Sequence, residues 1–172
     1  MRRRLSLIGL SGLTALGLAL LAGTALSQQK SLKDQLVGSW TLVSASQVTK
    51  EGAESDRWGP NPRGRAIFEA DGRYSFMIFR SDVPKFASNN MNDVTAEESK
   101  VAIKGMTANF GTWSIDEASK TLTTNIEAAS SPNLTGGTQK RIITSLSADE
   151  LKYTNPASQI GTVDDVVWKR SK

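Results

Sequence analysis

From residue 40 onward the chain contains eight short strand-like runs, in many of which apolar and polar side chains alternate. This period of two is typical of β-strands, whose successive side chains point to opposite faces of a sheet. Two segments carry helix signals instead. A serine N-cap and a leucine pair one turn apart predict a short helix over residues 31–37, and a threonine N-cap predicts a helix from Thr95 to about Lys104. Eight strands are predicted, over residues 40–48, 64–70, 73–80, 106–115, 121–129, 138–146, 151–154 and 163–169.

The connections between the predicted strands alternate between long and tight. In an up-and-down meander, alternate connections lie at opposite ends, so all long connections should gather at one open rim. The pattern therefore predicts an all-β fold, a single eight-stranded up-and-down antiparallel barrel, whose closure removes exposed sheet edges. The long connections span residues 49–62, 82–105, 130–137 and 155–162, and the tight ones are the Asp71-Gly72 hairpin and residues 116–119 and 147–150.

The first 27 residues differ in composition from the rest of the chain. Three arginines are followed by an uncharged apolar stretch, and Ala25 and Ser27 supply small residues at a cleavage site. This pattern is typical of a secretory signal peptide, so we expect an exported protein, periplasmic or secreted, whose mature chain starts at Gln28. A retained membrane anchor is the alternative, because the apolar stretch is just long enough to span a bilayer. The expected organisation is a signal peptide over residues 1–27 and one barrel domain over residues 28–172.

The composition excludes several kinds of chemistry. The chain has no Cys and no His, so it can form neither a Ser-His-Asp triad, nor a Cys nucleophile, nor a His/Cys zinc site. It also has no Asp/Asn loop of the calcium-binding type. Three of the 21 basic residues lie in the signal segment, which leaves 18 against 17 acidic residues scattered along the barrel domain. We therefore expect no metal, no cofactor and no nucleic-acid partner.

The two ends of the barrel domain should meet at the rim of tight turns. The last strand ends where the first begins, and closure of the barrel makes these strands neighbours. Arg170 should therefore stack on Trp40, a contact worth about 0.5–2 kcal/mol. Gly38 and Trp168 complete this structural motif.

The pairing of Gly38-Ser39-Trp40 with a basic residue at the chain's end, Arg170 or as the alternative Lys169, resembles the lipocalin or calycin superfamily. More specifically, the chain is similar to the bacterial and fungal lipocalin-like domain family over residues 36–170. Further motifs of that likeness follow in order at residues 62–68, 71–75, 109–116, 132–136 and 167–170. The chain departs from the family pattern at Thr124 and Asn125, where members often carry His, and at Leu134, where they often carry an aromatic. The resemblance implies a barrel that binds small molecules and implies no reaction.

Candidate binding residues lie on the predicted walls and open rim. Arg65 and Arg80 should lie at the open end, either as ligand contacts or as solvated charges. Trp58, in the first long connection, should be either a lid over the mouth or a plug in a satellite core. The residues expected to line the cup are Phe76, Ile78, Phe110 and Tyr153.

The hairpin of the fifth and sixth strands leaves two alternatives for Arg141. If the hairpin is symmetric about Leu134, Glu127 faces Arg141 in an ion pair on the outer face, and Leu122, Ile126, Ile142 and Leu146 point inward. A one-residue slip of register would turn Arg141 and Glu127 into the cup. There an arginine could hold an acidic group of a ligand with two parallel hydrogen bonds.

These observations favour an exported barrel that binds a small, largely apolar molecule, without stable membrane insertion after signal cleavage. An isomerase or cyclase acting on such a ligand is one alternative, and a filled barrel that contacts other envelope proteins is another. The volume of the internal cavity distinguishes the filled barrel from the other two. A buried, unpaired carboxylate in the cavity would favour an enzyme.

Overall fold

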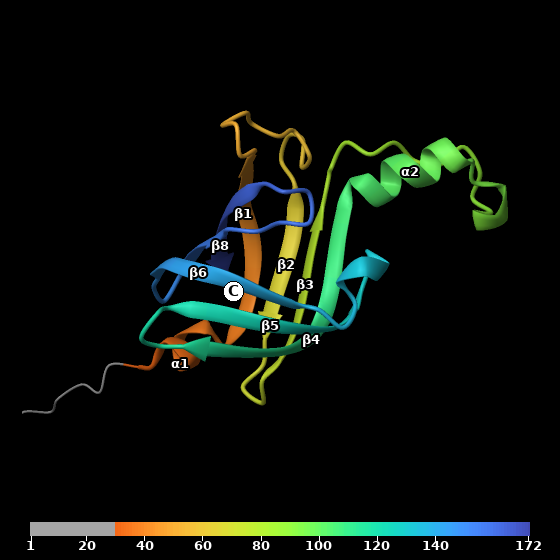
Figure 1. Ribbon diagram of the computed structural model, residues 1–172. Coiled ribbons are helices and arrows are strands. Elements are labelled where there is room, and N and C mark those ends of the chain that lie inside the picture. Colours follow the sequence, from red (N-terminus) through yellow and green to blue (C-terminus); the bar gives the residue numbers. More distant parts are fainter. Residues whose placement is uncertain (1–29) are drawn as a thin grey trace, which may run out of the picture.

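The computed structural model describes residues 30–172, so the predicted signal peptide and Gln28 lie outside the described residues. Eight antiparallel strands form one closed barrel in which each strand pairs with its neighbours in sequence and β1 pairs with β8 (Figure 1). The predicted fold class is confirmed. The strands are β1 (Gly38–Val48), β2 (Arg63–Phe68), β3 (Arg73–Phe79), β4 (Met106–Asp116), β5 (Thr121–Ala129), β6 (Thr138–Leu146), β7 (Glu150–Asn155) and β8 (Val163–Arg170).

Both predicted helices are present. α1 (Leu32–Leu36) begins at Ser31, whose hydroxyl accepts a hydrogen bond from the Asp34 amide. α2 (Ala96–Lys104) begins with a capping box between Thr95 and Glu98 and projects away from the barrel (Figure 1). Two short 3₁₀ turns are η1 (Met91–Asp93) and η2 (Pro132–Leu134). Within residues 30–172, no helix has the length and apolar character needed to cross a membrane.

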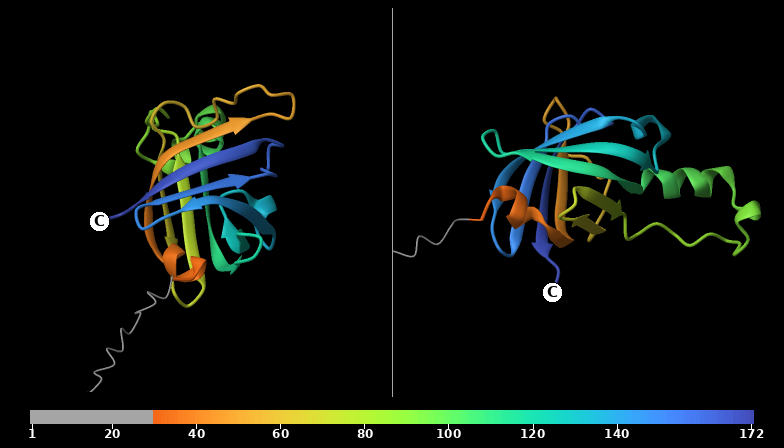
Figure 2. Two further views of the ribbon diagram at one scale, coloured as in Figure 1. Left: turned by 90° about the vertical axis from the view of Figure 1, so that its left-hand side faces the viewer. Right: turned by 90° about the horizontal axis from the view of Figure 1, so that it is seen from below.

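The two ends of the barrel carry different kinds of connection, as predicted. α1 covers the end with the tight turns, where its first amides donate to Glu117 of the β4–β5 turn and Leu36 is fully buried. In Figure 2, α1 and the β2–β3 turn lie together at one end, and the β1–β2 connection lies at the other. Residues from all four long connections line a single groove at this other end, which is the open rim. The arrangement leaves one end of the barrel closed and the other accessible.

The core consists of every second residue of each strand, as the period of two requires. Trp40 and Trp168 are fully buried near the closed end, and Trp168 meets Phe76 edge to face with 5.7 Å between ring centroids. Other buried core residues include Leu36, Ala66, Phe68, Tyr74, Ile78, Trp113, Leu122, Leu151, Tyr153 and Val166. This core extends from the closed end to the internal cavity, which Phe76, Ile78, Tyr153 and Val166 line.

The register of β5 against β6 differs from the symmetric hairpin. Arg141 lies opposite Leu122, five positions away from Glu127. Because the shift is odd, β6 turns its other face inward: Arg141 is buried, whereas Ile142 is 45% exposed. The reason is the connection, since the β5–β6 ladder ends at Asn125↔Thr138 and η2 occupies the intervening chain. A β-bulge between Ile143 and Ser145 then returns Leu146 to the edge of the core.

The position of Phe110 also differs from the prediction that it lines the cup. The odd-numbered residues of β4 point inward, among them Asn109 and Trp113, and Phe110 is 51% exposed on the outer face. Residues three positions apart cannot share a face of a regular strand, so Trp113 and Phe110 could not both line the interior. Phe110 is therefore not a cavity-lining residue.

Candidate functional site

A buried arginine lies inside the open half of the barrel. Arg141 is 5% exposed, and its Nη1 and Nη2 donate hydrogen bonds of 2.9 and 2.7 Å to Thr124 Oγ1 and Gln139 Oε1. The central carbon of its guanidinium lies 5.3 Å from the ring centroid of Phe76 and 5.6 Å from that of Tyr153. β3, β5, β6 and β7 each contribute one of these contacts, so the rigid barrel wall fixes the orientation of the guanidinium.

An internal cavity of about 50 Å³ lies beside Arg141. Phe76, Ile78 and Tyr153 line it, as the sequence predicted, together with Trp58 and Val166. This volume holds a few water molecules or one small functional group and falls below the range of about 300–1,000 Å³ typical of small-molecule pockets. The interior of the barrel is therefore nearly filled.

A buried carboxylate borders the same cavity. Asp164 of β8 is 9% exposed and accepts a hydrogen bond of 2.6 Å from the Thr162 hydroxyl. Burial raises the pKa of Asp164, and the hydrogen bonds from Thr162 and Gln47 and the attraction of Arg57 oppose this only in part. Burial also lowers the pKa of Arg57. The desolvation of both groups thus outweighs their mutual attraction, which is the usual balance for separated buried charges.

Two buried tyrosines interact with Arg141. The hydroxyl of Tyr74 donates a hydrogen bond of 2.7 Å to Asn109 Oδ1. Burial raises the pKa of both Tyr74 and Tyr153, so both stay neutral near neutral pH. Apart from Arg57, the residues that line the cavity around Arg141 and Asp164 are therefore uncharged.

A second and much larger space lies outside the barrel at the open rim. This groove, which we call the rim groove, has a volume of about 890 Å³ and runs between α2 and η2. Its exposed apolar residues include Val101 (40% exposed), Ile103 (57%) and Ile160 (53%). Three residues, Arg57, Thr107 and Gln159, line both the rim groove and the internal cavity. The two spaces therefore adjoin.

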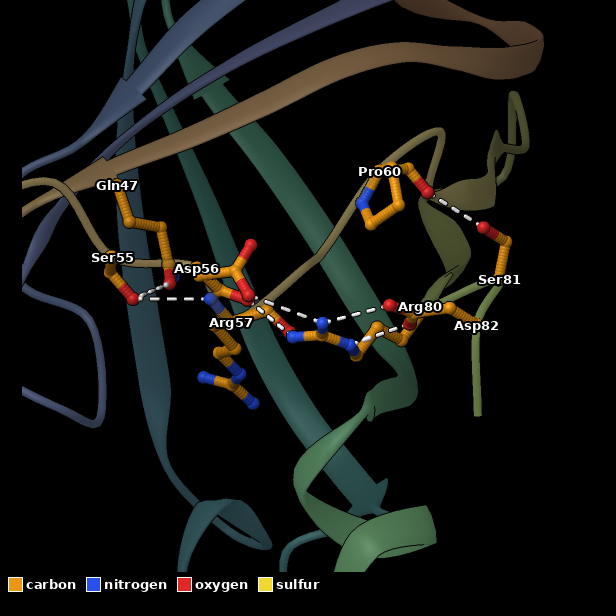
Figure 3. Close-up of polar contacts among 8 residues, drawn as sticks. All are labelled: Gln47, Ser55, Asp56, Arg57, Pro60, Arg80, Ser81 and Asp82. Carbon is orange, nitrogen blue, oxygen red and sulfur yellow. Dashed lines mark hydrogen bonds and ion pairs between the residues drawn. The ribbon is translucent and has the colours of Figure 1, made fainter. Parts of the chain in front are cut away.

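Arg80 joins two of the rim connections (Figure 3). Its Nε and Nη2 bind the Asp82 carboxylate at 2.6 and 2.9 Å, and Nη2 also binds the Asp56 carboxylate at 3.2 Å. Its Nη1 donates to the backbone carbonyls of Asp56 and Arg57. The hydrogen bonds from Arg80 lower the pKa of Asp82, and the two carboxylates raise the pKa of Arg80. Arg80 thus fixes the segment that precedes Trp58.

Trp58 closes the mouth of the barrel from within. It is 6% exposed, belongs to the main core and lines the internal cavity. The guanidinium of Arg57 covers its ring at 4.5 Å from the centroid. Of the two predicted positions, a lid or a plug, the structure places Trp58 as a plug, in the main core and not in a satellite core.

The remaining predicted site residues lie away from the cavity. Arg65 is exposed on β2, opposite Thr41 and Met77, and Glu127 is exposed on β5. The outer-face ion pair between Glu127 and Arg141 is therefore wrong. The inward alternative is right for Arg141 and wrong for Glu127.

Sequence reasoning missed Asp164 and the apolar residues of the rim groove. A signal for Asp164 was available, because it shares the parity of Val166 and Trp168 on β8. No such signal marked Ile103 or Ile160, since both lie in long connections without strand periodicity. Within residues 30–172, no cluster of three or more Asp or Glu side chains could hold a metal ion.

Comparisons with known proteins give one family and several distant structures. The family model described as "lipocalin-like domain" matches residues 37–171. No curated protein matches the chain.

Three solved structures have similar folds at low identity. A lipocalin-like protein from Bacteroides uniformis is 13% identical with a TM-score of 0.41, over 80% of this chain and 99% of that one. A redesigned β-barrel is 13% identical with a TM-score of 0.43, over 83% of this chain and all of that one. Bovine odorant binding protein, in complex with a selenium-containing odorant, is 14% identical with a TM-score of 0.42, over 84% of this chain and 76% of that one.

Proposed function

The chain belongs to the lipocalin-like domain family, and from this premise we propose that it is an exported protein that binds a small, largely apolar molecule at the open end of its barrel. The observation that carries the proposal is the rim groove, whose volume of about 890 Å³ lies within the range of known small-molecule pockets. The groove also adjoins the internal cavity at Arg57, Thr107 and Gln159.

Removal of apolar surface from water supplies the driving force. Val101, Ile103 and Ile160 are each at least 40% exposed in the groove, and their burial contributes about 25 cal/mol per Å² of apolar surface. Polar groups at the inner end of the groove, Arg57 and Gln159 among them, orient the ligand. An apolar molecule that lies along α2 and η2 satisfies both features.

A matched pair of variants tests this site. We expect an environment-sensitive apolar dye to bind the purified domain, and Ile103→Ser to weaken binding about ten- to a hundredfold, because the loss of one buried isoleucine side chain is worth roughly 1.5–3 kcal/mol. Ile142→Ser is the control, since Ile142 is 45% exposed on the outer wall and outside the groove. Equal loss in both variants, or no dye binding to the wild type, would contradict the proposal.

Asp164 favours a second candidate, an enzyme that moves a proton within a bound ligand. It is a buried carboxylate with a raised pKa in a cavity that also holds an arginine, and perturbed carboxylates of this kind are typical of acid–base sites. Turnover of a bound carbonyl compound that Asp164→Asn abolishes while leaving its binding intact would support an enzyme. Turnover that is equal in this variant would exclude Asp164 as the acid or base.

The small internal cavity favours a third candidate, a filled barrel that contacts other proteins of the envelope. The dye experiment separates it from the first. If no apolar probe binds at the rim groove, this candidate takes the place of ligand binding.

Export is the remaining component of the proposal and is supported by the composition of residues 1–27. Expression of the full chain in a bacterial host should yield mature protein that begins at Gln28. Protein that still begins at Met1 in the membrane fraction would favour a retained anchor.

A further inference from the structure

Arg141 carries a buried positive charge without a counter-ion among residues 30–172. Its hydrogen-bond partners, Thr124 and Gln139, are neutral, and within the described residues no carboxylate lies within 4.0 Å of its guanidinium. Buried charges in proteins are normally paired, because an isolated ion loses its hydration without compensation. The guanidinium nevertheless lies at a cavity, where an anion could reach it.

We propose that Arg141 binds the carboxylate of an amphipathic acid whose acid group enters the internal cavity while its apolar body lies in the rim groove. This inference rests on the proposed ligand binding at the open rim and specifies the chemical class of the ligand.

The size of each space supports this division of the ligand. The internal cavity of about 50 Å³ is large enough for a carboxylate in place of a few waters and too small for an apolar chain or ring system. The rim groove of about 890 Å³ accommodates the apolar part. The two spaces share Arg57, Thr107 and Gln159 as walls, so a ligand that occupies both passes between these three side chains.

The charges that line the cavity favour an anion. They are the guanidiniums of Arg57 and Arg141 and the carboxylate of Asp164, which leaves one positive charge in excess. The other polar groups at the cavity, among them Asn109, Tyr153 and Asn155, are neutral. Burial raises the pKa of Asp164, so its own negative charge opposes an incoming carboxylate less than an ordinary aspartate would.

The guanidinium is also oriented in advance. A guanidinium has five N–H donors, and Thr124 and Gln139 accept from Nη1 and Nη2, which leaves donors for a ligand. The rings of Phe76 and Tyr153 limit its movement on two sides. A charge-assisted hydrogen bond in such a water-poor site is stronger than one to a neutral group.

Three probes with the same apolar chain test the proposal: decanoate, decan-1-ol and methyl decanoate, each measured by displacement of the apolar dye. We expect decanoate to bind the wild-type domain at least tenfold more tightly than decan-1-ol, and Arg141→Gln to abolish this preference. Arg65→Gln is the matched control, because Arg65 lies exposed on the outer wall. Equal binding of the acid and the alcohol to the wild type would overturn the proposal and leave apolar binding intact. Failure of all three probes and of the dye would overturn both.

A second measurement uses the wild-type domain alone and does not depend on the folding of a variant. The ¹³C shift of [1-¹³C]decanoate reports the ionisation of the bound carboxyl group. Contact with Arg141 should hold its pKa below that of free decanoate, because the nearby positive charge stabilises the ionised form. A bound pKa equal to or above the free value would overturn the proposal.

Discussion

The guanidinium of Arg170, the last residue of β8, lies over the indole of Trp40 near the start of β1, with its central carbon 4.2 Å from the ring centroid. The same guanidinium donates hydrogen bonds to the carbonyls of Val37 and Gln35. Trp40 Nε1 donates a hydrogen bond of 2.9 Å to the Leu36 carbonyl. These contacts join the last strand of the barrel to its first strand and to α1. They hold the closed end together where the two ends of the barrel domain meet.

Replacement of Arg170 by methionine should destabilise the domain by about 2–4 kcal/mol, because it removes the cation–π contact and the charge-assisted hydrogen bonds to backbone carbonyls. Methionine keeps most of the apolar length of the side chain. Urea unfolding followed by far-UV circular dichroism measures the change. Lys169→Met is the control, since Lys169 is exposed next to Arg170 and should shift the unfolding midpoint little.

Gly38→Ala tests whether the closed rim requires glycine at this backbone position. Gly38 has φ +132°, where side chains are disfavoured, and an added Cβ would lie 2.6 Å from Arg170 Nη1. We expect a loss of roughly 1–3 kcal/mol in the free energy of unfolding from strain and displacement of Arg170. In a double-mutant cycle with Arg170→Met, part of this loss should disappear, because the clash partner is gone. Additive effects would mean that strain alone accounts for the loss.

Asp164→Asn should make the domain more stable at neutral pH. Burial raises the pKa of Asp164 above its ordinary value of 3.8, so between these two values the folded state binds more protons than the unfolded state. The stability contribution of this group therefore falls as pH rises through that window. Asparagine keeps an acceptor for Thr162 and carries no charge.

Thermal unfolding across pH measures this effect. The melting temperature of Asp164→Asn should exceed that of the wild type at pH 7, and the difference should shrink as pH falls below the ordinary pKa of an aspartate. Asp165→Asn is the control, because Asp165 is exposed on the other face of β8. A lower melting temperature for Asp164→Asn at pH 7 would mean that the hydrogen bonds to the Asp164 carboxylate and the attraction of Arg57 together outweigh its desolvation.

Arg80→Gln should loosen the segment that carries the Trp58 plug. Arg80 binds the carbonyls of Asp56 and Arg57 and the carboxylates of Asp56 and Asp82. Without these contacts, we expect trypsin to cleave after Arg57 several-fold faster and the amides of residues 56–59 to exchange faster with solvent. Arg65→Gln is the control, and unchanged cleavage in Arg80→Gln would show that packing of Trp58 alone holds the segment.

Much of the architecture could be predicted from local sequence patterns. Alternation of apolar residues marked most of the strands, because adjacent side chains of a strand point to opposite faces whatever the strand pairs with. The order of long and tight connections then placed Asp71-Gly72 and the rim connections at opposite ends. The meeting of Trp40 and Arg170 followed from closure of an even number of strands.

The candidate site depended on non-local geometry. Whether Arg141 points into the barrel is decided by the register of β5 against β6, and that register depends on how η2 folds within the intervening connection. Asp164 and Asp165 are adjacent residues of the same type, and the fold buries only Asp164. This burial raises the pKa of Asp164. Ile103 and Ile160 line the same groove only because the fold brings α2 and the β7–β8 connection together.

The sequence by itself thus determined the strands, their order and the closed rim, because these depend on periodicity and on which segments are adjacent along the chain. The tertiary structure decided which charges lie inside the barrel and where free volume remains. A shift of register by an odd number of residues turns the inward side chains of a strand outward and the outward ones inward, although the sequence of the strand is unchanged. Burial, the pKa of a buried group and cavity volume depend on neighbours brought together from distant parts of the chain.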